Sequence, residues 1–357
     1  MERRKTREIQ IGTVRIGGDH PVAVQSMNNT DTRDVQASVR QILELAEAGC
    51  DITRLAVPDM EAAGAFAEIR RQSPIPIVAD IHFDYRLALA AINAGADKIR
   101  INPGNIGDPE RVRQVARAAK AAGIPLRIGV NSGSLRQDII DRNGGVNAAS
   151  MVESVLEHVQ LLERFDFDQL CLSIKASDPL LTIEAYRRLA DQTDYPLHLG
   201  VTEAGTRREG TIRSAVGIGT LLAEGIGDTI RVSLTADPVE EIHAGYAILK
   251  SLGLRRRGPE LISCPTCGRT AVDLQQVAEA VEARLQEIRH PIRVAVMGCA
   301  VNGPGEARHA DIGLAGGRGE FLIFRRGKIL RKVPQEQAVE ALMKEIRQLC
   351  DELDGNV

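Results

Sequence analysis

Short apolar runs rich in β-branched residues alternate with longer segments of helical spacing between about residue 20 and residue 250. Eight such runs occur: Val22–Met27, Ile52–Val57, Pro76–Asp80, Ile99–Pro103, Leu126–Asn131, Leu170–Lys175, Leu197–Glu203 and Thr229–Leu234. A strand followed by a helix, repeated eight times over this length, predicts an α/β fold of the (β/α)8 barrel type. An open doubly wound sheet is the alternative, but it has fewer strands and a glycine-rich turn after the first strand. Here Gln25-Ser26-Met27 stands in that place, which favours the barrel.

A weak internal repeat within this region supports the barrel. The pattern Asp-x-x-Arg follows a helix-ending glycine at Asp51, Asp97 and Asp228. The preceding segment Ile9–Ile16, which turns at Gly12, predicts a small hairpin that plugs the bottom of the barrel.

The pattern changes after Arg255, where arginines, a glycine and a proline predict a linker. We therefore expect two domains, a TIM barrel over residues 1–254 and a smaller α+β domain over residues 259–357. For the second domain the hydrophobic spacing predicts a helix carrying Val277, Val281 and Leu285 on one face, a strand at Ile292–Met297, a hairpin near Glu320–Val333 and a final helix to about Glu352.

Composition narrows the function classes. The 357 residues include 45 basic and 48 acidic side chains, a net charge of −3, which gives no overall field for a nucleic acid or a membrane. No apolar run approaches the ~20 residues of a membrane helix, and the charged segment Met1–Glu8 has no signal-peptide core, so we expect a cytoplasmic protein. Four Tyr, six Phe and no Trp argue against a base-stacking surface. Six Cys indicate metal or redox chemistry rather than disulfides.

Cationic residues interrupt strands that should be almost wholly apolar, because both faces of such strands are covered. Five of the runs carry Arg54, Arg100, Arg127, Lys175 and Arg231, and His198 lies within a sixth. An unpaired buried cation costs several kcal/mol, so each requires an anionic partner. Pairing with Asp80, Glu203 or the aspartates of the repeat is one interpretation. For five cations at one barrel mouth the internal acids are too few, which favours a strongly anionic ligand, and a diphosphate best fits forked guanidinium donors.

The loops after these strands agree with a phosphate site. Asn102–Gly107 and Asn131–Ser134 are small, polar and contain glycine, so their backbone N–H groups are available to phosphate oxygens. Asp80 and His82 after the third strand, and Glu203 after the seventh, are candidates for proton transfer or for orienting a substrate. Each of the three is equally suited to hold an arginine in place, and the residues alone leave both roles open.

Three cysteines form a second candidate site. Cys264-Pro-Thr-Cys267 lies on a turn just after the linker, and Cys299 follows in the segment Met-Gly-Cys-Ala-Val-Asn-Gly-Pro-Gly-Glu. A Cys-x-x-Cys turn directs two thiolates at one metal centre, and Cys299 adds a third. Three thiolates favour a [4Fe–4S] cluster with one distinctive iron, for which Glu306 is a candidate fourth ligand. Structural zinc stays open as the alternative, with Cys350 or His309 as its fourth ligand. The remaining thiols are expected in the cores: Cys50, Cys171 and Cys350.

These motifs together resemble the 4-hydroxy-3-methylbut-2-enyl diphosphate synthase family. The resemblance rests on Cys-Pro-Thr-Cys-Gly-Arg (264–269), the segment 297–306, Val-Gln-Ser-Met (24–27), Ala-Asp-Ile-His-Phe (79–83), Arg-Ile-Asn-Pro-Gly-Asn-Ile-Gly (100–107), Arg-Ile-Gly-Val-Asn-Ser-Gly-Ser-Leu (127–135), Thr-Glu-Ala-Gly (202–205) and Arg-Val-Ser-Leu-Thr (231–235). It implies a TIM barrel that binds 2-C-methyl-D-erythritol 2,4-cyclodiphosphate and a small domain that carries a [4Fe–4S] cluster. The implied reaction is a two-electron ring opening and dehydration in the methylerythritol phosphate route to isoprenoids.

The resemblance also implies roles for individual residues. The cluster ligands would be Cys264, Cys267, Cys299 and Glu306, and the cyclic diphosphate would be held by Arg54, Arg100, Arg127, Lys175, Asn131 and Ser233. Further candidates at the substrate are Arg231, His198, Asp80 and His82, and Glu203 is the candidate proton donor. The implied partners are flavodoxin or ferredoxin as electron donor and a second copy of the chain in a head-to-tail homodimer.

Two other functions stay open at this level. One is a non-redox TIM-barrel synthase of pterin type, acting on a phosphorylated substrate and carrying structural zinc in its smaller domain. The other is a binding module whose cysteine domain contacts RNA or a protein, although the sequence shows no basic, aromatic face for RNA.

Overall fold

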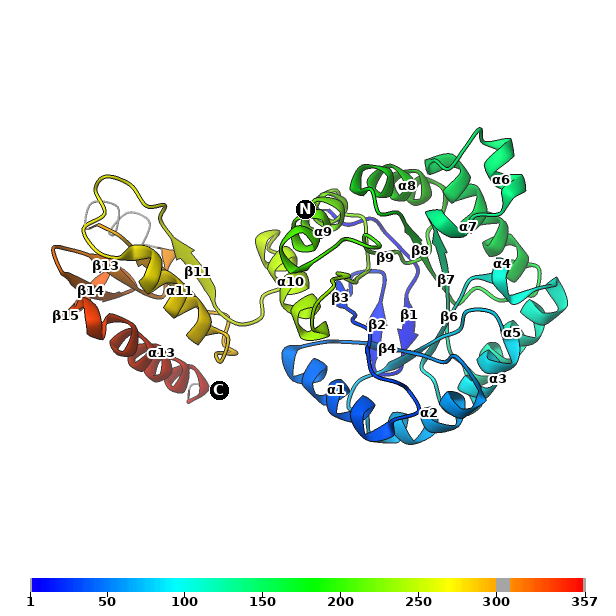
Figure 1. Ribbon diagram of the computed structural model, residues 1–357, viewed down its shortest axis with the longest axis horizontal. Coiled ribbons are helices and arrows are strands. Elements are labelled where there is room, and N and C mark those ends of the chain that lie inside the picture. The colour runs from blue at the N-terminus through cyan, green and yellow to red at the C-terminus, as the bar shows by residue number, and fades with distance from the viewer. Residues whose placement is uncertain (1, 300–308, 356–357) are drawn as a thin grey trace. The chain divides into compact units, whose positions relative to one another are not determined.

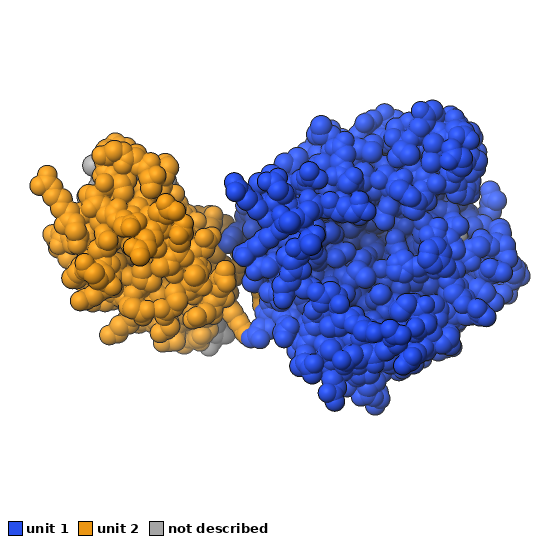
Figure 2. All heavy atoms as spheres, viewed as in Figure 1, with its two compact units in different colours: residues 1–255 blue, residues 256–357 orange. Residues whose placement is uncertain are grey.

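The computed structural model describes residues 2–299 and 309–355 and divides the chain into two compact units, residues 1–255 and 256–357 (Figure 2). Glu306, the predicted fourth metal ligand, lies outside the described residues. Among the helices that are described, none is long and apolar enough to cross a membrane.

The first unit is a closed barrel of parallel strands, seen as a ring in Figure 1. The strands are β3 (Ala23–Val24), β4 (Thr53–Ala56), β5 (Ile77–Asp80), β6 (Lys98–Ile101), β7 (Leu126–Asn131), β8 (Leu170–Lys175), β9 (His198–Leu199) and β10 (Thr229–Ile230). One arc runs from β4 to β8 and the other is β9–β10–β3. The parallel bridges Gln25–Ile52 and Leu172–Leu197 join the two arcs and close the ring. The predicted (β/α)8 barrel is therefore confirmed.

Helices surround this ring in the order that the sequence predicts. They are α1 (Val35–Ala48), α2 (Met60–Gln72), α3 (Tyr85–Asn93), α5 (Pro109–Ala122), α7 (Ala148–Glu163), α8 (Pro179–Gln192), α9 (Arg207–Ala223) and α10 (Pro238–Ser251), and α4 (Pro103–Ile106), η1 (Ser132–Ser134) and α6 (Gln137–Arg142) lie in the loops after β6 and β7. Six begin at an aspartate whose carboxylate accepts a backbone N–H of the first turn: Asp34, Asp59, Asp84, Asp108, Asp178 and Asp237. These caps satisfy otherwise unpaired donors and fix where each βα loop ends.

A hairpin of β1 (Ile9–Ile11) and β2 (Val14–Ile16) closes the amino-terminal end of the barrel. The hairpin's isoleucines form one buried cluster with Ile52 and Val78 of the barrel strands. Its turn needs glycine, because Gly12 has a φ of 55° and an added Cβ would lie 2.6 Å from Asp97 Oδ1. The predicted plug is confirmed.

The aspartates of the internal repeat all cap neighbouring strands at this end of the barrel. Asp51 accepts a hydrogen bond from Val24 N, Asp97 from Ile77 N and Asp228 from Leu197 N, each within 2.7–2.8 Å. Their ion-pair partners are Arg255, Arg70 and Arg3 respectively. The repeat is thus a structural device, and its aspartates pair with arginines other than those predicted at the barrel mouth.

The second unit is an α+β domain, as predicted. Its sheet has the order β11 (Glu260–Ser263), β12 (Arg293–Met297), β13 (Ile312–Gly316), β14 (Glu320–Arg325) and β15 (Lys328–Pro334). β11, β12 and β13 are parallel, and β14 and β15 add antiparallel ladders. The helices α11 (Leu274–Leu285) and α13 (Ala338–Asp354), the latter preceded by η3 (Gln335–Gln337), bury their apolar faces on one side of the sheet.

Two strands of this sheet, β11 and β13, escaped the sequence analysis. β13 reads Ile-Gly-Leu-Ala-Gly, and glycine and alanine are poor strand formers. Gly313 is nevertheless required, because an added Cβ would lie 2.4 Å from Ala295 O on the neighbouring strand. A close approach between backbones, which a single sequence does not reveal, therefore overrides the local propensity.

Candidate active site

Six cationic side chains, from four barrel strands and from the residue that follows a fifth, gather within the first unit. They are Arg54, Lys98, Arg100, Arg127, Lys175 and Arg231. The ladder places Arg100 opposite Asp80 on one side and Arg127 on the other, so these side chains share the inner face. Lys98 is fully buried and Arg127 is 2% exposed. Five of the six were predicted, and the structure brings them together in the barrel interior.

Asp80 is the acid nearest to two of these cations. Its carboxylate lies 3.1 Å from Arg100 Nη1 and 3.5 Å from Arg54 Nε, and His82 Nε2 lies 3.8 Å away. Burial alone would raise the pKa of Asp80, but the charges of Arg54 and Arg100 outweigh burial and lower it from 3.8 to about 2. Asp80 is therefore an anion that orients two arginines. The predicted role of holding an arginine in place thus has direct geometric support.

Glu241, which the sequence analysis missed, is the second acid of the cluster. It lies in the first turn of α10, is 3% exposed, and pairs with Arg231 at 3.1 Å. Its carboxylate also accepts hydrogen bonds from Ser26 Oγ at 2.8 Å and Leu234 N at 3.1 Å. Its helical spacing could have revealed Glu241 in the sequence. It stands three residues before Ala244 and four before Gly245, so it lies on the buried face of α10. A carboxylate on an apolar stripe requires a partner.

Lys98 and Arg127 keep nitrogen atoms without partners. Within the part of the chain that is described, neither Lys98 Nζ nor Arg127 Nε has a hydrogen-bond partner. Burial lowers the pKa of Lys98 to about 8 and that of Arg127 to about 10. The sequence analysis missed Lys98, although it stands two residues before Arg100 and so faces the same side of β6. These unpaired donors make the interior suited to an anion.

Two glycines make room for the cations. An added Cβ at Gly129 would lie 2.8 Å from Arg100 Nε, and one at Gly200 would lie 2.4 Å from Lys175 Nζ. Lys175 Nζ lies 3.5 Å from Nε2 of His198, which is fully buried. His198 thus lies beside a predicted substrate residue, below the surface of the barrel interior.

The two predicted phosphate loops contact one another. Asn102 Oδ1 accepts a hydrogen bond from Gly104 N at 3.2 Å, and Asn102 Nδ2 donates to Ser134 Oγ at 3.4 Å. Ser134 Oγ in turn accepts from Asn131 N at 3.3 Å. The loops after β6 and β7 are therefore one polar surface, although about 30 residues separate them in the sequence.

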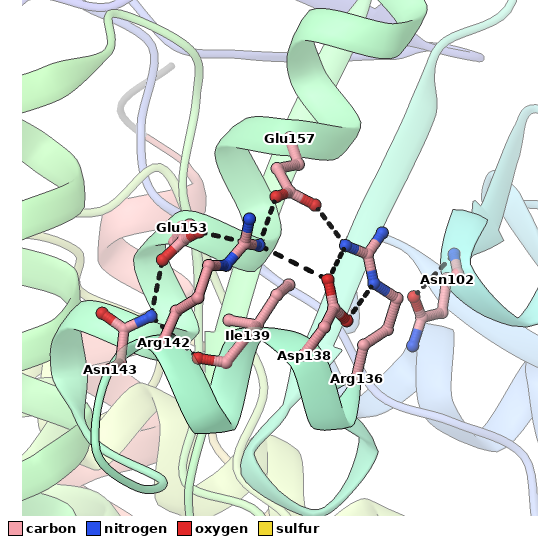
Figure 3. Close-up of polar contacts among 9 residues, drawn as sticks. Asn102, Arg136, Asp138, Ile139, Arg142, Asn143, Glu153 and Glu157 are labelled. Carbon is pink, nitrogen blue, oxygen red and sulfur yellow. Dashed lines mark hydrogen bonds and ion pairs between the residues drawn. The ribbon is translucent and has the colours of Figure 1, made fainter.

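An ion-pair network anchors the helix that follows these loops (Figure 3). On α7, Glu157 pairs with both Arg136 and Arg142 at 2.9 Å, and Glu153 pairs with Arg142 at 2.9 Å. Arg136 also contacts Asp138 at 2.8 Å. Because these residues come from the start and end of α6 and from α7, the network holds α6 against α7. It fixes the carboxyl side of the Asn131–Ser134 loop.

Glu203, Arg231 and Ser233 line a hollow of about 270 Å³ at the ends of β9 and β10. Glu203 is exposed and has a φ of 51°, a left-handed conformation that non-glycine residues rarely adopt. Such strain is concentrated at functional sites, where the surrounding structure enforces it. The structure thus brings three predicted residues together around one open space.

The cysteine site forms where two parallel strands of the second unit end. β11 and β12 pair with Ser263 opposite Val296, so Cys264 and Cys299 both follow the carboxyl ends of neighbouring strands. Cys264 Sγ accepts a hydrogen bond from Gly298 N at 3.2 Å, and Cys267 is exposed. The backbone N–H of Arg269 lowers the pKa of the Cys267 thiol. Cys50, Cys171 and Cys350 are buried in the cores, as predicted.

The three thiols at this edge of the sheet are donors of the kind that a thiolate-bound metal centre uses. Among the described residues, no three His, Cys, Asp or Glu side chains lie close enough to hold a metal ion. All six cysteines are unpaired thiols, which leaves Cys264, Cys267 and Cys299 free to bind metal. Cys264 and Cys299 follow two adjacent strand ends, and the lowered pKa of the Cys267 thiol makes its thiolate easier to form, which suits a soft metal.

Fold and site together define the class of the chain: a (β/α)8 barrel with a cation-lined interior, followed by an α+β unit with a Cys-x-x-Cys turn. Residues 6–246 match the GcpE TIM-barrel domain, and residues 260–348 match the GcpE protein C-terminal domain. The chain therefore belongs to the GcpE family, and the resemblance found in the sequence is confirmed.

Similar proteins agree over nearly the whole chain. A 4-hydroxy-3-methylbut-2-en-1-yl diphosphate synthase (flavodoxin) of Ruminiclostridium cellulolyticum is 60% identical over 349 residues, covering 98% of this chain and 99% of that protein. The enzyme of the same name from Geobacter sulfurreducens is 57% identical over 348 residues, again covering 98% and 99%.

Among solved structures, a dihydropteroate synthase of Yersinia pestis has a TM-score of 0.50 at 10% identity, covering 70% of this chain and 100% of that one. At such low identity this similarity shows the barrel fold alone. It therefore gives no support to the alternative of a pterin-type synthase.

Proposed function

We propose that the chain is a 4-hydroxy-3-methylbut-2-enyl diphosphate synthase. It converts 2-C-methyl-D-erythritol 2,4-cyclodiphosphate into (E)-4-hydroxy-3-methylbut-2-enyl diphosphate in the methylerythritol phosphate pathway. The observation that carries this proposal is the 60% identity to an enzyme of that name over 98% of the chain. The non-redox synthase and the binding module have no comparable support.

The barrel interior would bind the diphosphate. Arg127 and Lys98 have nitrogen atoms without partners, and the predicted clamp adds Arg54, Arg100 and Lys175. Only two carboxylates of the described interior, Asp80 and Glu241, offset this charge, as the ion pairs show. Asn131 from the β7 loop and Ser233 from the β10 end supply neutral polar contacts. His198 contacts Lys175, His82 lies beside Asp80, and Arg231 lines the same hollow as Ser233, so all three would lie near the bound substrate.

The second unit would hold a [4Fe–4S] cluster through Cys264, Cys267 and Cys299, with Glu306 as the fourth ligand. The fit rests on the thiol set at the β11 and β12 ends. A carboxylate ligand exchanges more readily than a thiolate on a soft metal, so Glu306 would leave a coordination position accessible. When bound, such a cluster supplies the two electrons of the reaction one at a time.

The chain's own residues would balance the charge that the reaction creates. The carbon–oxygen bond to one phosphate breaks, and the released oxygen keeps the electron pair, so the cations of the barrel would stabilise a diphosphate with one more negative charge. The substrate hydroxyl leaves as water and needs a proton. Glu203 lies in the hollow beside Arg231 and Ser233, which supports it as the proton donor.

Partners and location follow from the same family membership. Flavodoxin is the electron donor that the relatives' names give, and ferredoxin is the alternative. The assembly that we propose is a head-to-tail homodimer, in which the cysteine unit of one chain works with the barrel of the other. A cytoplasmic location is in keeping with six unpaired thiols, because reducing compartments preserve them.

Metal analysis of anaerobically purified protein tests the proposal. We expect about four iron and about four sulfide per chain, and conversion of the cyclic diphosphate in the presence of reduced flavodoxin. Cys264→Ser should lose the visible absorbance of the cluster and the turnover. The matched control Cys350→Ser, which removes a thiol from the core of the same unit, should keep both. One zinc per chain, or iron without turnover of the cyclic diphosphate, would contradict the proposal.

A further inference from the structure

A buried chain of polar contacts leads from Lys175 across the barrel. Lys175 Nζ lies 3.5 Å from His198 Nε2, and His198 Nδ1 lies 2.5 Å from Thr229 Oγ1. The three residues come from the neighbouring strands β8, β9 and β10, where His198 is opposite Thr229 in the ladder. His198 and Thr229 are fully buried, and Lys175 is 7% exposed. The sequence analysis singled out Lys175 and His198 and did not consider Thr229.

Hydrogen-bond chemistry selects one tautomer of His198. A lysine side chain donates toward its neighbour, so His198 Nε2 must present its lone pair to Lys175. A neutral imidazole then carries its hydrogen on Nδ1, which donates to Thr229 Oγ1. With the opposite tautomer, Nε2–H would point at the ammonium group of Lys175. The Thr229 hydroxyl, as acceptor, therefore determines which nitrogen faces Lys175.

The charges around Lys175 and His198 make the Nε2 lone pair of His198 important. The charged groups that act most strongly on Lys175 and His198 from the other strands are cationic: Arg54, Lys98, Arg100, Arg127 and Arg231. Two further titratable groups lie beside them, the Cys171 thiol and the Tyr186 hydroxyl, and burial raises the pKa of both, so they are neutral neighbours. Burial, followed by the charge of Arg127, lowers the pKa of both Lys175 and His198 well below their ordinary values. His198 therefore stays neutral, and the acceptor at Nε2 is the contact that opposes the loss of the Lys175 proton.

The backbone holds the chain of contacts in place. Tyr186 OH on α8 donates to His198 O at 2.5 Å and accepts from Ile174 N at 3.1 Å, which ties β8 to β9. The absence of a side chain at Gly200 leaves the space that Lys175 Nζ occupies. His198 is thereby fixed between a lysine on one side and a threonine on the other.

We propose that Thr229 and His198 are positioning residues that keep Lys175 cationic and oriented for a bound diphosphate, an inference that rests on the proposed function. Thr229 fixes the tautomer of His198, and the Nε2 lone pair of His198 stabilises the ammonium group of Lys175. Neither residue touches the ligand. This pair, the His198–Thr229 relay, therefore acts on binding only through the charge and the orientation of Lys175.

Calorimetric titration of the holoenzyme with the cyclic diphosphate and with inorganic diphosphate, from about pH 6.5 to pH 9, tests the relay. A bound anion raises the pKa of Lys175, so binding is strong at low pH and weakens as the pH rises above the pKa of Lys175 in the free protein. Thr229→Val has nearly the same shape but no acceptor. In this variant the Nδ1–H of His198 has no acceptor as long as Nε2 accepts from a protonated Lys175. The variant therefore favours loss of the Lys175 proton. We expect the affinity of the Thr229→Val variant to fall at a pH about one unit lower than that of the wild type, which makes its binding about tenfold weaker at high pH. Near pH 6.5 its affinity should lie within about twofold of the wild-type value.

Matched variants separate this role from a structural one. Thr229→Ser keeps the hydroxyl and should keep the wild-type pH profile. His198→Gln, which retains an acceptor near the position of Nε2, should bind more tightly than His198→Met, which has none. In a Lys175→Met background, Thr229→Val should have no further effect on affinity. A pH profile of Thr229→Val equal to that of the wild type, or an undiminished effect of this change without Lys175, would overturn the relay.

The two ligands separate this inference from the proposed function. If the wild type binds inorganic diphosphate with the expected pH profile but not the cyclic diphosphate, the proposed function is contradicted and the relay stands. If it binds both and the Thr229→Val profile is unchanged, the relay is contradicted and the proposed function stands.

Discussion

Glu203 shows how one residue combines strain with a candidate role. Its φ of 51° places a long side chain in the left-handed region, which costs about 1–2 kcal/mol relative to an ordinary conformation. Glu203 lies at the edge of the hollow that Arg231 and Ser233 also line. A destabilising conformation kept at the edge of a candidate site indicates that function, rather than stability, determines this position.

Two amide substitutions at Glu203 test this interpretation. Glu203→Gln should lower kcat by about 100-fold or more, because the proton donor is lost, and should leave the affinity for the cyclic diphosphate and the stability nearly unchanged. Glu203→Asn should be equally inactive yet more stable by about 0.5–1 kcal/mol, because asparagine tolerates the left-handed conformation. Turnover assays and urea denaturation measure both effects. A Glu203→Gln enzyme with wild-type kcat would remove Glu203 from proton delivery.

At the scale of elements, the first turn of α10 organises the end of the neighbouring strands. Glu241 binds Ser26 after β3 as well as Arg231 and Leu234 after β10. One buried carboxylate thus connects a helix to two strand ends that are about 200 residues apart in the sequence. The preceding Glu240 lies on the outer side of the same turn and pairs with Arg207.

Neutralising these two glutamates should have unequal effects. Glu241→Gln leaves Arg231 without its buried counter-charge and should lower the free energy of unfolding by about 2–4 kcal/mol. Glu240→Gln, one residue earlier in the same turn, removes a partly exposed ion pair and should cost less than about 1 kcal/mol. Urea denaturation of both variants provides the comparison. Equal stabilities of the two variants would show that Glu241 is not a structural anchor.

Most of the barrel's helices and strands could be predicted from the sequence. The alternation of apolar runs and helical spacing predicted the barrel, because strand and helix periods are local properties of the sequence. The pairing of Glu241 with Arg231 was not readable, since it depends on which inner positions of α10 and β10 face each other after the ring closes. Gly313 likewise allows a close backbone contact in β13 that only the assembled sheet reveals.

At the scale of the whole molecule, each of the two units has a main hydrophobic core of its own among the described residues. One is built from the barrel strands and helices, and the other from α11, α13 and the sheet of the second unit. The units meet in sequence at Arg255 and Arg256. The candidate diphosphate site and the cysteine site therefore lie on different units, each with its own core, and the proposed head-to-tail dimer would bring together two such units from different chains.

Heterodimers test the proposed assembly. A chain with Arg127→Met has a defective barrel, and a chain with Cys264→Ser has a defective cysteine unit. Co-expressed with different tags and purified as heterodimers, the two should regain about half of the wild-type turnover, because one of two head-to-tail sites combines the intact parts. Each variant alone should be inactive. Heterodimers without activity would show that each chain serves itself.

The sequence by itself determined the fold class, the family, the inward cations at strand ends and the three thiols, because residue type and local spacing carry those signals. Only the tertiary structure decided which acid neutralises which cation, that Lys98 joins the cluster, and that His198 lies between Lys175 and Thr229. Apart from the Glu241–Arg231 pair between helix α10 and the end of β10, these contacts join strands about 20–30 residues apart. They depend on ladder register and ring closure. A residue's partner across a barrel is a property of the closed sheet, whereas its inward or outward direction is a property of its own strand.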